Sequence, residues 1–377
     1  MPKIVILGAG RVGSAIAKDL CLQFDVTAVD LDDSVLNRLN TTHAIKTFKA
    51  DLTDINYSEL LSGSDLVISA VPGYLGYSTL KKIIEAKKNV VDISFFSEDP
   101  FALDELARNN KVQAIIDCGV APGMGNIILG RYNRMMTVDR YECLVGGLPV
   151  LREWPWQYKA VFSPIDVIEE YIRPARFVSG GKIITREALS DPEIIDFDEI
   201  GALESFNTDG LRTLIRTMKI PDMIEKTLRY PGTIEYLQVL RSVGFFSYEW
   251  VDVDGKKLRP IDFTSKLLFP KWKLNEGEKD LTIMRIIIHG NVEGKDQTIT
   301  YKLLDRYDEK NSILSMARTT GYTCCAVAHL LIRKKVSGFG ILPPEFIGED
   351  KDNFEFIIDY LANRNVIYHK TIIYNKK

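Results

Sequence analysis

Short apolar runs alternate with amphipathic segments along the first third of the chain. The apolar runs lie at residues 3–7, 26–29, 44–50, 65–71, 89–93 and 113–116. Runs of about 4–8 apolar residues bounded by turn residues are typical of strands buried in a parallel sheet. Helices are expected between them, at residues 57–61, 79–87 and 101–109 and where Val12, Ile16 and Leu20 recur at helical spacing. The pattern predicts a doubly wound α/β sheet of six strands.

The pattern changes after Gly123. Strands are expected at residues 141–148 and 175–184, and a hairpin joins residues 281–292 to residues 296–304. Helices are expected at residues 319–334 and 354–363. This mixture predicts a second, α+β domain with a mainly antiparallel sheet. We expect the first domain at residues 1–124 and the second at 125–312, with helices from about 313–377 returning to the first.

Three glycines follow the first apolar run at the spacing of a strand-to-helix turn. Gly8 permits a tight turn, Gly10 lets the backbone approach a pyrophosphate, and Gly13 lets the helix lie close to the strand. The helix directs its N-terminal amides at a phosphate. Asp30 ends the second run, where a carboxylate accepts a hydrogen bond from a ribose hydroxyl. Strand, turn, helix, strand and acid in this order predict a Rossmann dinucleotide-binding domain.

The acid at residue 30 also bears on the choice of cofactor. Asp32 and Asp33 follow it closely, and we expect no neighbouring cation. A 2′-phosphate would meet like charge here, so NAD is favoured over NADP. The alternative is that Asp30 only ends a strand.

Ligands of open α/β sheets lie at the carboxyl ends of the strands, so the cofactor contacts are expected there. The expected contacts are Gly8, Gly10, Arg11, Val12, Gly13, Asp30, Asp51, Leu52, Ala70, Val71, Pro72, Asp92, Gly119, Gly123 and Met124. For the glycines after the sixth run, which surround Pro122, the alternative is a structural loop without cofactor contact.

Composition narrows the class of protein. The net charge of −3 argues against a nucleic-acid or anionic-membrane partner, and no apolar stretch approaches the ~20 residues that span a bilayer. The five cysteines are odd in number and two are adjacent, which favours reduced thiols and a cytoplasmic protein. The four histidines are scattered without ligand-like spacing, so no metal site is expected.

Six further segments occur in a characteristic order. They are DCGVAPGMGN (117–126), GGLPVLREWPWQYKAVFSP (146–164), ALESFNTDGLRTL (202–214), KTLRYPGTIEYLQVLRSVGFF (226–246), SMARTTGY (315–322) and GILPPE (340–345). With these segments the chain resembles the saccharopine dehydrogenase superfamily, and most closely its short lysine 6-dehydrogenase branch. The resemblance implies a second domain that carries an amino-acid site, with hydride transfer between a carbon–nitrogen bond and a nicotinamide.

The resemblance leaves the substrate open. The first hypothesis is oxidative deamination of the L-lysine ε-amine to allysine, which cyclises to piperideine-6-carboxylate, with hydride transfer to NAD. The second is a saccharopine dehydrogenase, in which the same step releases glutamate. The third is a non-catalytic NAD-sensing regulatory protein, because residues 3–54 also resemble the nucleotide-binding regulatory domains of potassium transporters.

Candidate substrate and catalytic residues come from the same segments. A substrate carboxylate prefers a guanidinium, so Arg229 is the first candidate, ahead of Arg173 and Arg318. Tyr158 and Tyr171 are candidates for lining the pocket; the alternative for both is a place in the core. Asp92 and Asp117 end strands, where a carboxylate holds the substrate ammonium, takes its proton, or caps the following turn. For Arg229 the alternative is an ion pair within the protein. A homodimer formed through the antiparallel sheet is the expected assembly.

Overall fold

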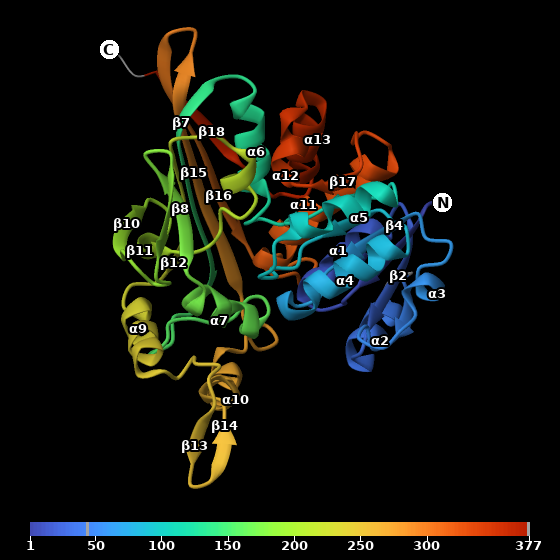
Figure 1. Cartoon of the computed structure of the whole chain (residues 1–377), viewed down its shortest axis with the longest axis horizontal. Helices are drawn as coiled ribbons and strands as arrows, with labels where there is room; N and C mark the ends of the chain where they lie inside the picture. The colour runs from blue at the N-terminus through green and yellow to red at the C-terminus, as the bar shows by residue number, and fades with distance from the viewer. Residues whose placement is uncertain (43–44, 375–377) are drawn as a thin grey trace. The chain divides into compact units, whose positions relative to one another are not determined.

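The computed structural model describes residues 1–42 and 45–374, which form two compact units (Figure 1). Unit 1 contains Met1–Met135 and Ala317–Tyr368, and unit 2 contains Met136–Met316 and the segment from His369. The C-terminal segment is therefore divided, because its last strand pairs within the sheet of unit 2. The helices expected from about residue 313 lie in unit 1 between Ala317 and Tyr368, whereas the strand that follows them from His369 belongs to unit 2.

Unit 1 is built on a parallel sheet. Within the described residues its seven strands have the order β17-β6-β5-β4-β1-β2-β3, so the chain winds outward in both directions from β1. The strands are β1 (Lys3–Leu7), β2 (Asp25–Asp30), β3 (Lys46–Lys49), β4 (Leu66–Ser69), β5 (Val90–Asp92), β6 (Gln113–Ile115) and β17 (Gly340–Leu342). The doubly wound α/β architecture is confirmed.

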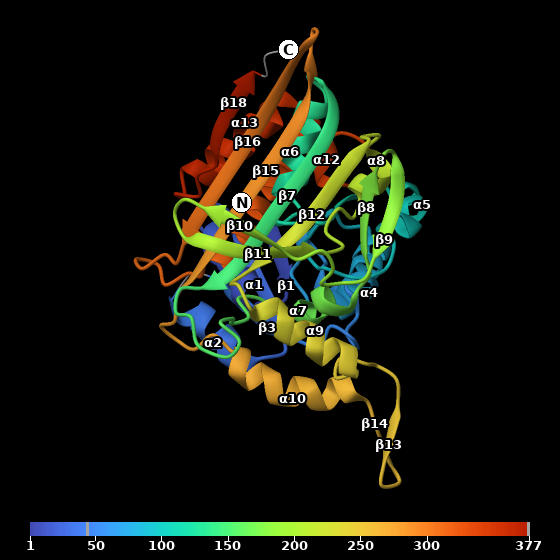
Figure 2. The same ribbon diagram turned by 90° about the vertical axis from the view of Figure 1, so that its left-hand side faces the viewer.

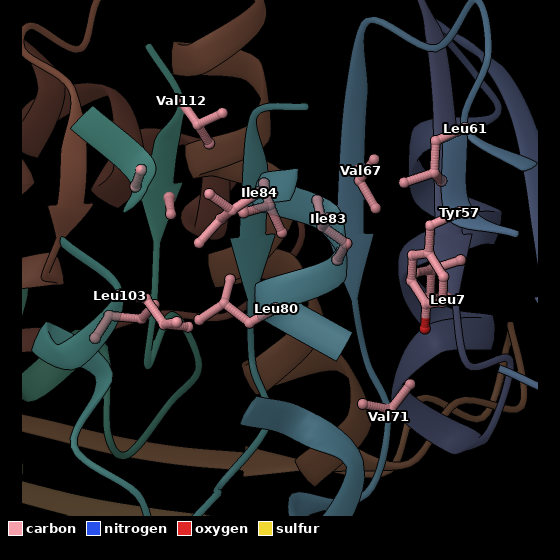
Figure 3. Close-up of a cluster of buried hydrophobic side chains, with 14 of the residues drawn as sticks. Leu7, Tyr57, Leu61, Val67, Val71, Leu80, Ile83, Ile84, Leu103 and Val112 are labelled. Atoms are coloured by element: carbon pink, nitrogen blue, oxygen red, sulfur yellow. The ribbon is translucent and has the colours of Figure 1, made fainter. Parts of the chain in front are cut away.

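Helices alternate with these strands. They are α1 (Arg11–Leu20), α2 (Asp33–Thr42), α3 (Tyr57–Leu60), α4 (Gly73–Glu85), the 3₁₀ helix η1 (Pro100–Leu103), α5 (Asp104–Asn109), α6 (Met124–Asn133), α11 (Ser315–Ile332), α12 (Pro344–Glu349) and α13 (Lys351–Ala362). One face of the sheet packs on α3, α4 and α5, and Figure 3 shows the buried side chains between them. Leu7 and Val67 come from the strands, while Leu80 and Ile84 come from α4. Burial of this continuous apolar layer stabilises the unit.

Two features of unit 1 differ from the sequence-based expectation. A seventh strand, β17, pairs with β6 although it follows it by more than 200 residues of chain. The helix expected at residues 79–87 begins earlier, at Gly73, and forms α4. Pro72 is its N-cap residue, and the proline ring fixes φ there at −56°. Of the strand expected at residues 44–50, Ala44 lies outside the described residues.

Unit 2 contains a mixed sheet that is mostly antiparallel, as expected. Its path runs β10-β11-β12-β7-β15-β16-β18, and β8 pairs with β12 and β9. The strands are β7 (Thr137–Pro149), β8 (Ala175–Ser179), β9 (Lys182–Arg186), β10 (Glu193–Phe197), β11 (Gly201–Asn207), β12 (Asp222–Arg229), β15 (Asp280–Val292), β16 (Lys295–Arg306) and β18 (His369–Tyr374). The predicted hairpin is confirmed as the pairing of β15 with β16.

The single strand expected at residues 175–184 is instead two. Strands β8 and β9 form a hairpin because Gly180 and Gly181 both adopt positive φ, at 56° and 75°, and reverse the chain between them.

Residues 233–272 form a projecting segment of unit 2, which we call the arm. It consists of α9 (Thr233–Val243), the hairpin of β13 (Val251–Val253) with β14 (Lys256–Leu258), and α10 (Pro260–Trp272). The hairpin extends away from the large sheet in Figures 1 and 2. Two short helices, α7 (Pro164–Ile172) and α8 (Leu214–Thr217), complete the unit. Across residues 1–42 and 45–374, none of the helices has both the length and the apolar character that a bilayer span requires.

Helices α6 and α12 of unit 1 meet through two glycines. A Cβ atom on Gly348 would lie 1.9 Å from the Ile127 carbonyl oxygen, and one on Gly130 would lie 2.0 Å from the Glu345 carbonyl oxygen. Each helix therefore presents its glycine to the backbone of the other, and the contact has no room for a methyl group.

Gly348→Ala should therefore destabilise the protein by about 2 kcal/mol or more, because the backbones must separate to admit the methyl group. Urea unfolding followed by circular dichroism measures this. Gly10→Ala is the matched control, because a Cβ there has no heavy atom within 4 Å. Equal stability of the two variants would contradict the close helix contact.

Candidate dinucleotide site and active-site residues

The glycine turn of unit 1 brings three backbone segments into contact. Gly8 has φ +92°, and a Cβ atom there would lie 2.5 Å from the Ala70 carbonyl oxygen at the end of β4. A Cβ atom on Gly13 would lie 2.0 Å from the Gly8 carbonyl oxygen. The first glycine thus allows the turn against the neighbouring strand, and the last allows α1 to pack on the turn.

Gly10 differs from these two glycines. No heavy atom of the described chain lies within 4 Å of a Cβ built on it. It is the N-cap residue of α1, and no side chain caps the helix there. No contact within residues 1–42 and 45–374 therefore requires a glycine at this position, whereas a diphosphate lying against the helix N-terminus would. The residues fit a dinucleotide.

The Asp30 carboxylate fixes the turn from the adjacent strand. Its Oδ2 accepts a hydrogen bond from the Ala9 backbone N–H at 2.6 Å, and its Oδ1 accepts one from the Asp32 N–H at 2.9 Å. The expectation that no cation lies nearby is wrong, because Lys49 is opposite Asp30 on β3 and its ammonium pairs with Asp33. The sequence hides this neighbour because it lies on a different strand.

The other expected contacts lie on the same edge of the sheet. Ala70, Val71 and Pro72 follow β4, and Asp51 and Leu52 follow β3, both parallel to the strand that leads into the glycine turn. The Asp51 carboxylate accepts hydrogen bonds from the Thr53 side chain and N–H, which lower its pKa. Arg11 and Val12 open helix α1. Contact with a cofactor stays a prediction for all of these residues.

The loop after β6 closes on itself. A Cβ atom on Gly123, which has φ +139°, would lie 1.9 Å from the Gly119 carbonyl oxygen. The Met124 N–H donates to that oxygen at 3.0 Å, and the side-chain oxygen of Asn126 accepts from the Gly123 N–H at 3.2 Å. These contacts alone require glycine, which is what the structural-loop alternative expects. Proximity to a nicotinamide stays a prediction.

Two buried carboxylates lie at the ends of neighbouring strands. Asp92 ends β5 and is 0% exposed; Asp117 follows β6 and is 1% exposed. The Asp92 carboxylate accepts hydrogen bonds from the Ser94 N–H and hydroxyl, both at 3.0 Å, so it caps the turn that follows it. The pKa of Asp92 is raised to about 7, chiefly by burial. Hydrogen bonds from Ser69 and Ser94 lower this pKa, and the nearby charge of Asp117 raises it. This carboxyl therefore titrates near neutral pH.

Cys118 lies between these two acids and the next helix. Its thiol is fully buried, and burial followed by the charges of Asp117 and Asp92 raises its pKa above the ordinary value. A thiolate is therefore disfavoured here, and the side chain serves as a small buried residue.

Arg229 of unit 2 lies in a buried cluster at the end of β12. Its guanidinium, 2% exposed, donates to the Glu170 carboxylate at 2.6 Å and to the Tyr171 hydroxyl at 3.0 Å. It also lies over the Tyr158 ring, 4.4 Å from the centroid. Burial lowers the pKa of this guanidinium, but Tyr171, Tyr158 and Glu170 outweigh burial and hold it above the ordinary value. This geometry favours the ion-pair alternative over a substrate-carboxylate site.

The remaining candidates are divided between the units. Tyr158 and Tyr171 are buried and contact the Trp272 ring edge-on, as members of an aromatic core in unit 2. Arg173 follows helix α7 in the same unit and lies 3.6 Å from the Glu169 carboxylate. Arg318 belongs to unit 1, where its guanidinium donates to the Arg364 carbonyl oxygen. A substrate role stays a prediction for each.

Several residues of these clusters were not anticipated. Ser69 and Ser94 bond Asp92, and Glu170 neutralises Arg229 from 59 residues away. For Ser94 a signal exists, because a serine two residues after an aspartate favours a turn. Glu170 gives no such signal. Among the described residues, no group of three or more His, Cys, Asp or Glu side chains is placed to hold a metal ion.

The fold and the glycine turn define a two-unit dinucleotide-binding protein, and comparison with known families agrees. Residues 4–115 match the saccharopine dehydrogenase NADP binding domain, and residues 119–367 match the saccharopine dehydrogenase C-terminal domain. The chain belongs to the saccharopine dehydrogenase family. The match to the first domain indicates a nicotinamide dinucleotide cofactor.

Individual relatives are distant in sequence. Mitochondrial alpha-aminoadipic semialdehyde synthase of Bos taurus is 21% identical over 91% of this chain and 45% of its own length. Carboxyaminopropylagmatine dehydrogenase of Synechocystis is 22% identical over 93% of this chain and 94% of its own. The structure of apo saccharopine dehydrogenase (L-Glu forming) from Saccharomyces cerevisiae has a TM-score of 0.78 at 19% identity, covering 99% of this chain and all of that one, which supports the fold. The chain spans about half the length of the first of these relatives.

Arg229→Met tests the ion pair. The change leaves the Glu170 carboxylate half-buried without its cation, so we expect a loss of about 3 kcal/mol of stability in urea unfolding. The double variant Arg229→Met with Glu170→Gln should recover part of that loss. If Arg229 instead holds a substrate carboxylate, stability stays near wild type while KM rises.

Proposed function

We propose that this chain is an NAD-dependent oxidoreductase that acts on the CH–NH group of an amino acid, with the L-lysine ε-amine as the first candidate substrate. The observation that carries the proposal is the glycine turn, in which Gly10 faces open space while Asp30 holds the turn from the adjacent strand. Membership of the saccharopine dehydrogenase family across both units supports the reaction class.

The reaction requires a neutral amine, because an ammonium nitrogen has no lone pair to help expel hydride from the adjacent carbon. A lysine ε-ammonium has a pKa of about 10.4, so the protein must lower it or accept its proton. The nicotinamide supplies the hydride acceptor. Loss of hydride from the neutral amine leaves an iminium ion, which water hydrolyses to an aldehyde and ammonium.

In the proposed reaction, two buried acids of unit 1, Asp92 and Asp117, have a structural role. Asp92 and Asp117 lie where parallel strands end, at the edge of the sheet that carries the glycine turn. Because the buried Asp92 side chain bonds Ser94, we assign it to holding the turn after β5. The same role after β6 is a prediction for the buried Asp117. Transfer of the substrate proton to Asp92, whose pKa of about 7 suits a base near neutral pH, is a further prediction.

The preference for NAD rests on Asp30. A carboxylate that already binds the turn is placed to accept from a ribose hydroxyl and to repel a 2′-phosphate. The matched family domain is described as NADP binding, and Lys49 lies one strand away, so NADP is the alternative. Asp30→Ser should weaken NAD binding and relax the preference.

A saccharopine-type secondary amine is the second candidate substrate. The similar structure from Saccharomyces cerevisiae is that of a saccharopine dehydrogenase (L-Glu forming), which supports this second candidate. The same hydride step on such an amine ends in release of an amino acid in place of ammonia. The two candidates therefore differ in product as well as in substrate.

Reduction of NAD by the purified chain distinguishes the candidates. We expect NADH absorbance to rise with L-lysine, with one ammonia released per NADH, and a smaller response when NADP replaces NAD. NADH formation with saccharopine and release of glutamate would move the assignment to the second candidate. If bound NAD is reduced with neither amine, the proposed substrate class is wrong.

Asp92→Asn separates the cost of burial from a role in proton transfer. The folded chain keeps this carboxyl protonated up to about pH 7, whereas in the unfolded chain the pKa of the carboxyl is the ordinary 3.8. Wild-type stability therefore falls as pH rises through this window, and the asparagine variant lacks that fall. Between about pH 5 and pH 8 the variant should gain about 3 kcal/mol of stability relative to wild type, because about two pH units separate pH 5 from the folded pKa and each is worth about 1.4 kcal/mol.

The exposed Asp51→Asn is the control, since its carboxylate has a lowered pKa and stays ionised over that range. Its stability difference from wild type should be constant with pH. Activity gives the second readout: a limb of kcat/KM near pH 7 that disappears in Asp92→Asn supports proton transfer. A uniform loss at every pH assigns the residue to positioning alone.

A further inference from the structure

A fully buried acid of unit 1, Glu345, is bonded to the helix that follows β6. Glu345 is the second residue of α12 and is 0% exposed. Removing a carboxylate from water costs stability, so a buried one is normally held by hydrogen-bond donors at close range. The side-chain amide of Asn126 on α6 is such a donor, 3.0 Å from a carboxylate oxygen, and it comes from 219 residues earlier in the chain.

The contact between α6 and α12 fixes where this carboxylate lies. Figures 1 and 2 show the two helices side by side, although they come from distant parts of the chain. A Cβ atom on Gly130 would lie 2.0 Å from the carbonyl oxygen of Glu345 itself. Gly130 follows Asn126 by four residues and shares its face of α6. Because the backbone of Glu345 lies directly against α6, its carboxylate has little freedom to move away from the Asn126 amide.

The carboxylate decides which way the Asn126 amide points. An asparagine amide has an accepting oxygen and a donating NH2 group, whereas a carboxylate only accepts. The Nδ2 group must therefore face Glu345, which leaves Oδ1 to face the other way. There Oδ1 accepts a hydrogen bond from the Gly123 N–H at 3.2 Å. The reversed amide would place oxygen against oxygen at one end and N–H against N–H at the other.

Gly123 is the point at which this amide meets the loop of residues 119–124. It has φ +139°, and a Cβ atom on it would lie 1.9 Å from the Gly119 carbonyl oxygen. The Gly119 N–H donates to the Pro122 carbonyl oxygen at 3.0 Å, and the Met124 N–H donates to the Gly119 carbonyl oxygen at 3.0 Å. Each of these contacts joins two parts of the loop, so a change at the Gly123 peptide alters the whole loop.

The strand order indicates which half of a bound dinucleotide this loop would meet. The glycine turn follows β1, and Asp30, the candidate ribose ligand, ends β2 on one side of β1. Strands β4, β5 and β6 lie on the other side, in that order. A dinucleotide that lies across the reversal of strand order, with its adenosine on the β2 side, extends its second half over the ends of β4 to β6. The loop after β6 is at the nicotinamide end.

We propose that Glu345 is a positioning residue for the nicotinamide. Through Asn126, it holds the loop of residues 119–124 in the conformation that receives the nicotinamide half of the cofactor. The inference rests on the proposed function, because it needs a nicotinamide dinucleotide at this edge of the sheet. It also gives the segment that matches the C-terminal family domain, residues 119–367, a part in holding the cofactor.

The emission of bound NADH tests this role without any turnover. A reduced nicotinamide fluoresces more strongly when it is held rigidly out of water, so the wild type should enhance the emission of NADH, or of NADPH if that binds more tightly. Glu345→Met removes the acceptor from the Asn126 amide and should lose most of this enhancement. It should also weaken binding of the reduced cofactor by ~10-fold, about the worth of one hydrogen bond.

Two comparisons make this result specific. ADP-ribose, which lacks the nicotinamide, should bind to Glu345→Met as it binds to the wild type. Glu345→Gln keeps an accepting oxygen and should stay near the wild type in both emission and affinity.

Reversal of the hydrogen bond gives a second test. Asn126→Asp puts a second carboxylate 3.0 Å from the first, so the NADH signal should fall as in Glu345→Met. Adding Glu345→Gln supplies an NH2 group that donates to the new carboxylate, which still accepts from the Gly123 N–H. The double variant should recover the wild-type signal.

Asn353→Asp is the matched control. The Asn353 side chain is 5% exposed, and its amide likewise donates to an acceptor, the Lys335 carbonyl oxygen, elsewhere in unit 1. The substitution makes the same chemical change at a site with no link to residues 119–124 in the proposal. It should lose stability but keep the NADH signal.

Unchanged NADH emission and affinity in folded Glu345→Met overturns the inference. An equal loss of ADP-ribose and NADH affinity also overturns it, because Glu345 then supports the unit as a whole. If Glu345→Met does not fold, the Asn126 variants decide, and a double variant that fails to recover the signal counts against the inference. A wild type that binds none of NADH, NADPH and ADP-ribose instead refutes the proposed function, and that failure is seen before any variant is made.

Discussion

The contact between backbones at the glycine turn is the constraint on which unit 1 depends. Gly8 lies against the end of β4, and α1 lies against Gly8 through Gly13, at distances that exclude any side chain. The first helix, the first strand and the fourth strand therefore have one mutual arrangement. Asp30 adds the end of β2 to it through the Ala9 amide. These contacts leave space beside Gly10, so the packing that stabilises the unit also shapes the candidate dinucleotide site.

The elements of unit 1 were largely predictable because each has a local pattern. The six expected strands all form. The three glycines also have the surroundings that their spacing predicts, since Gly8 and Gly13 lie against backbone atoms and Gly10 faces open space. The seventh strand was missed because Gly340–Leu342 is short and pairs with β6 far earlier in the chain. Likewise, Lys49 became a neighbour of the acidic end of β2 only through the pairing of β2 with β3. Pairing of distant segments leaves no periodic signal.

The candidate site of unit 2 shows the same limit more strongly. Arg229 stands out in the sequence as a cation before a turn, but its partner is decided by the tertiary fold. Glu170 on α7 and the rings of Tyr158 and Tyr171 enclose the guanidinium. These contacts favour an ion pair within the protein. The sequence alone does not distinguish such an arginine from one that binds a substrate carboxylate. The tyrosines pack with Trp272, as aromatic residues in a core do.

The divided course of the chain has a consequence for its synthesis on the ribosome. Strand β17 completes the sheet of unit 1, and β18 is then added to the edge of the unit 2 sheet beside β16. Both pieces are translated after residue 339, so neither sheet can be completed while most of the chain is emerging. During that interval the edges of β6 and β16 lack their neighbours, and such unpaired edges favour misassembly. When many copies are translated at once, these two edges of the nascent chains are therefore open to binding by chaperones and to pairing between chains.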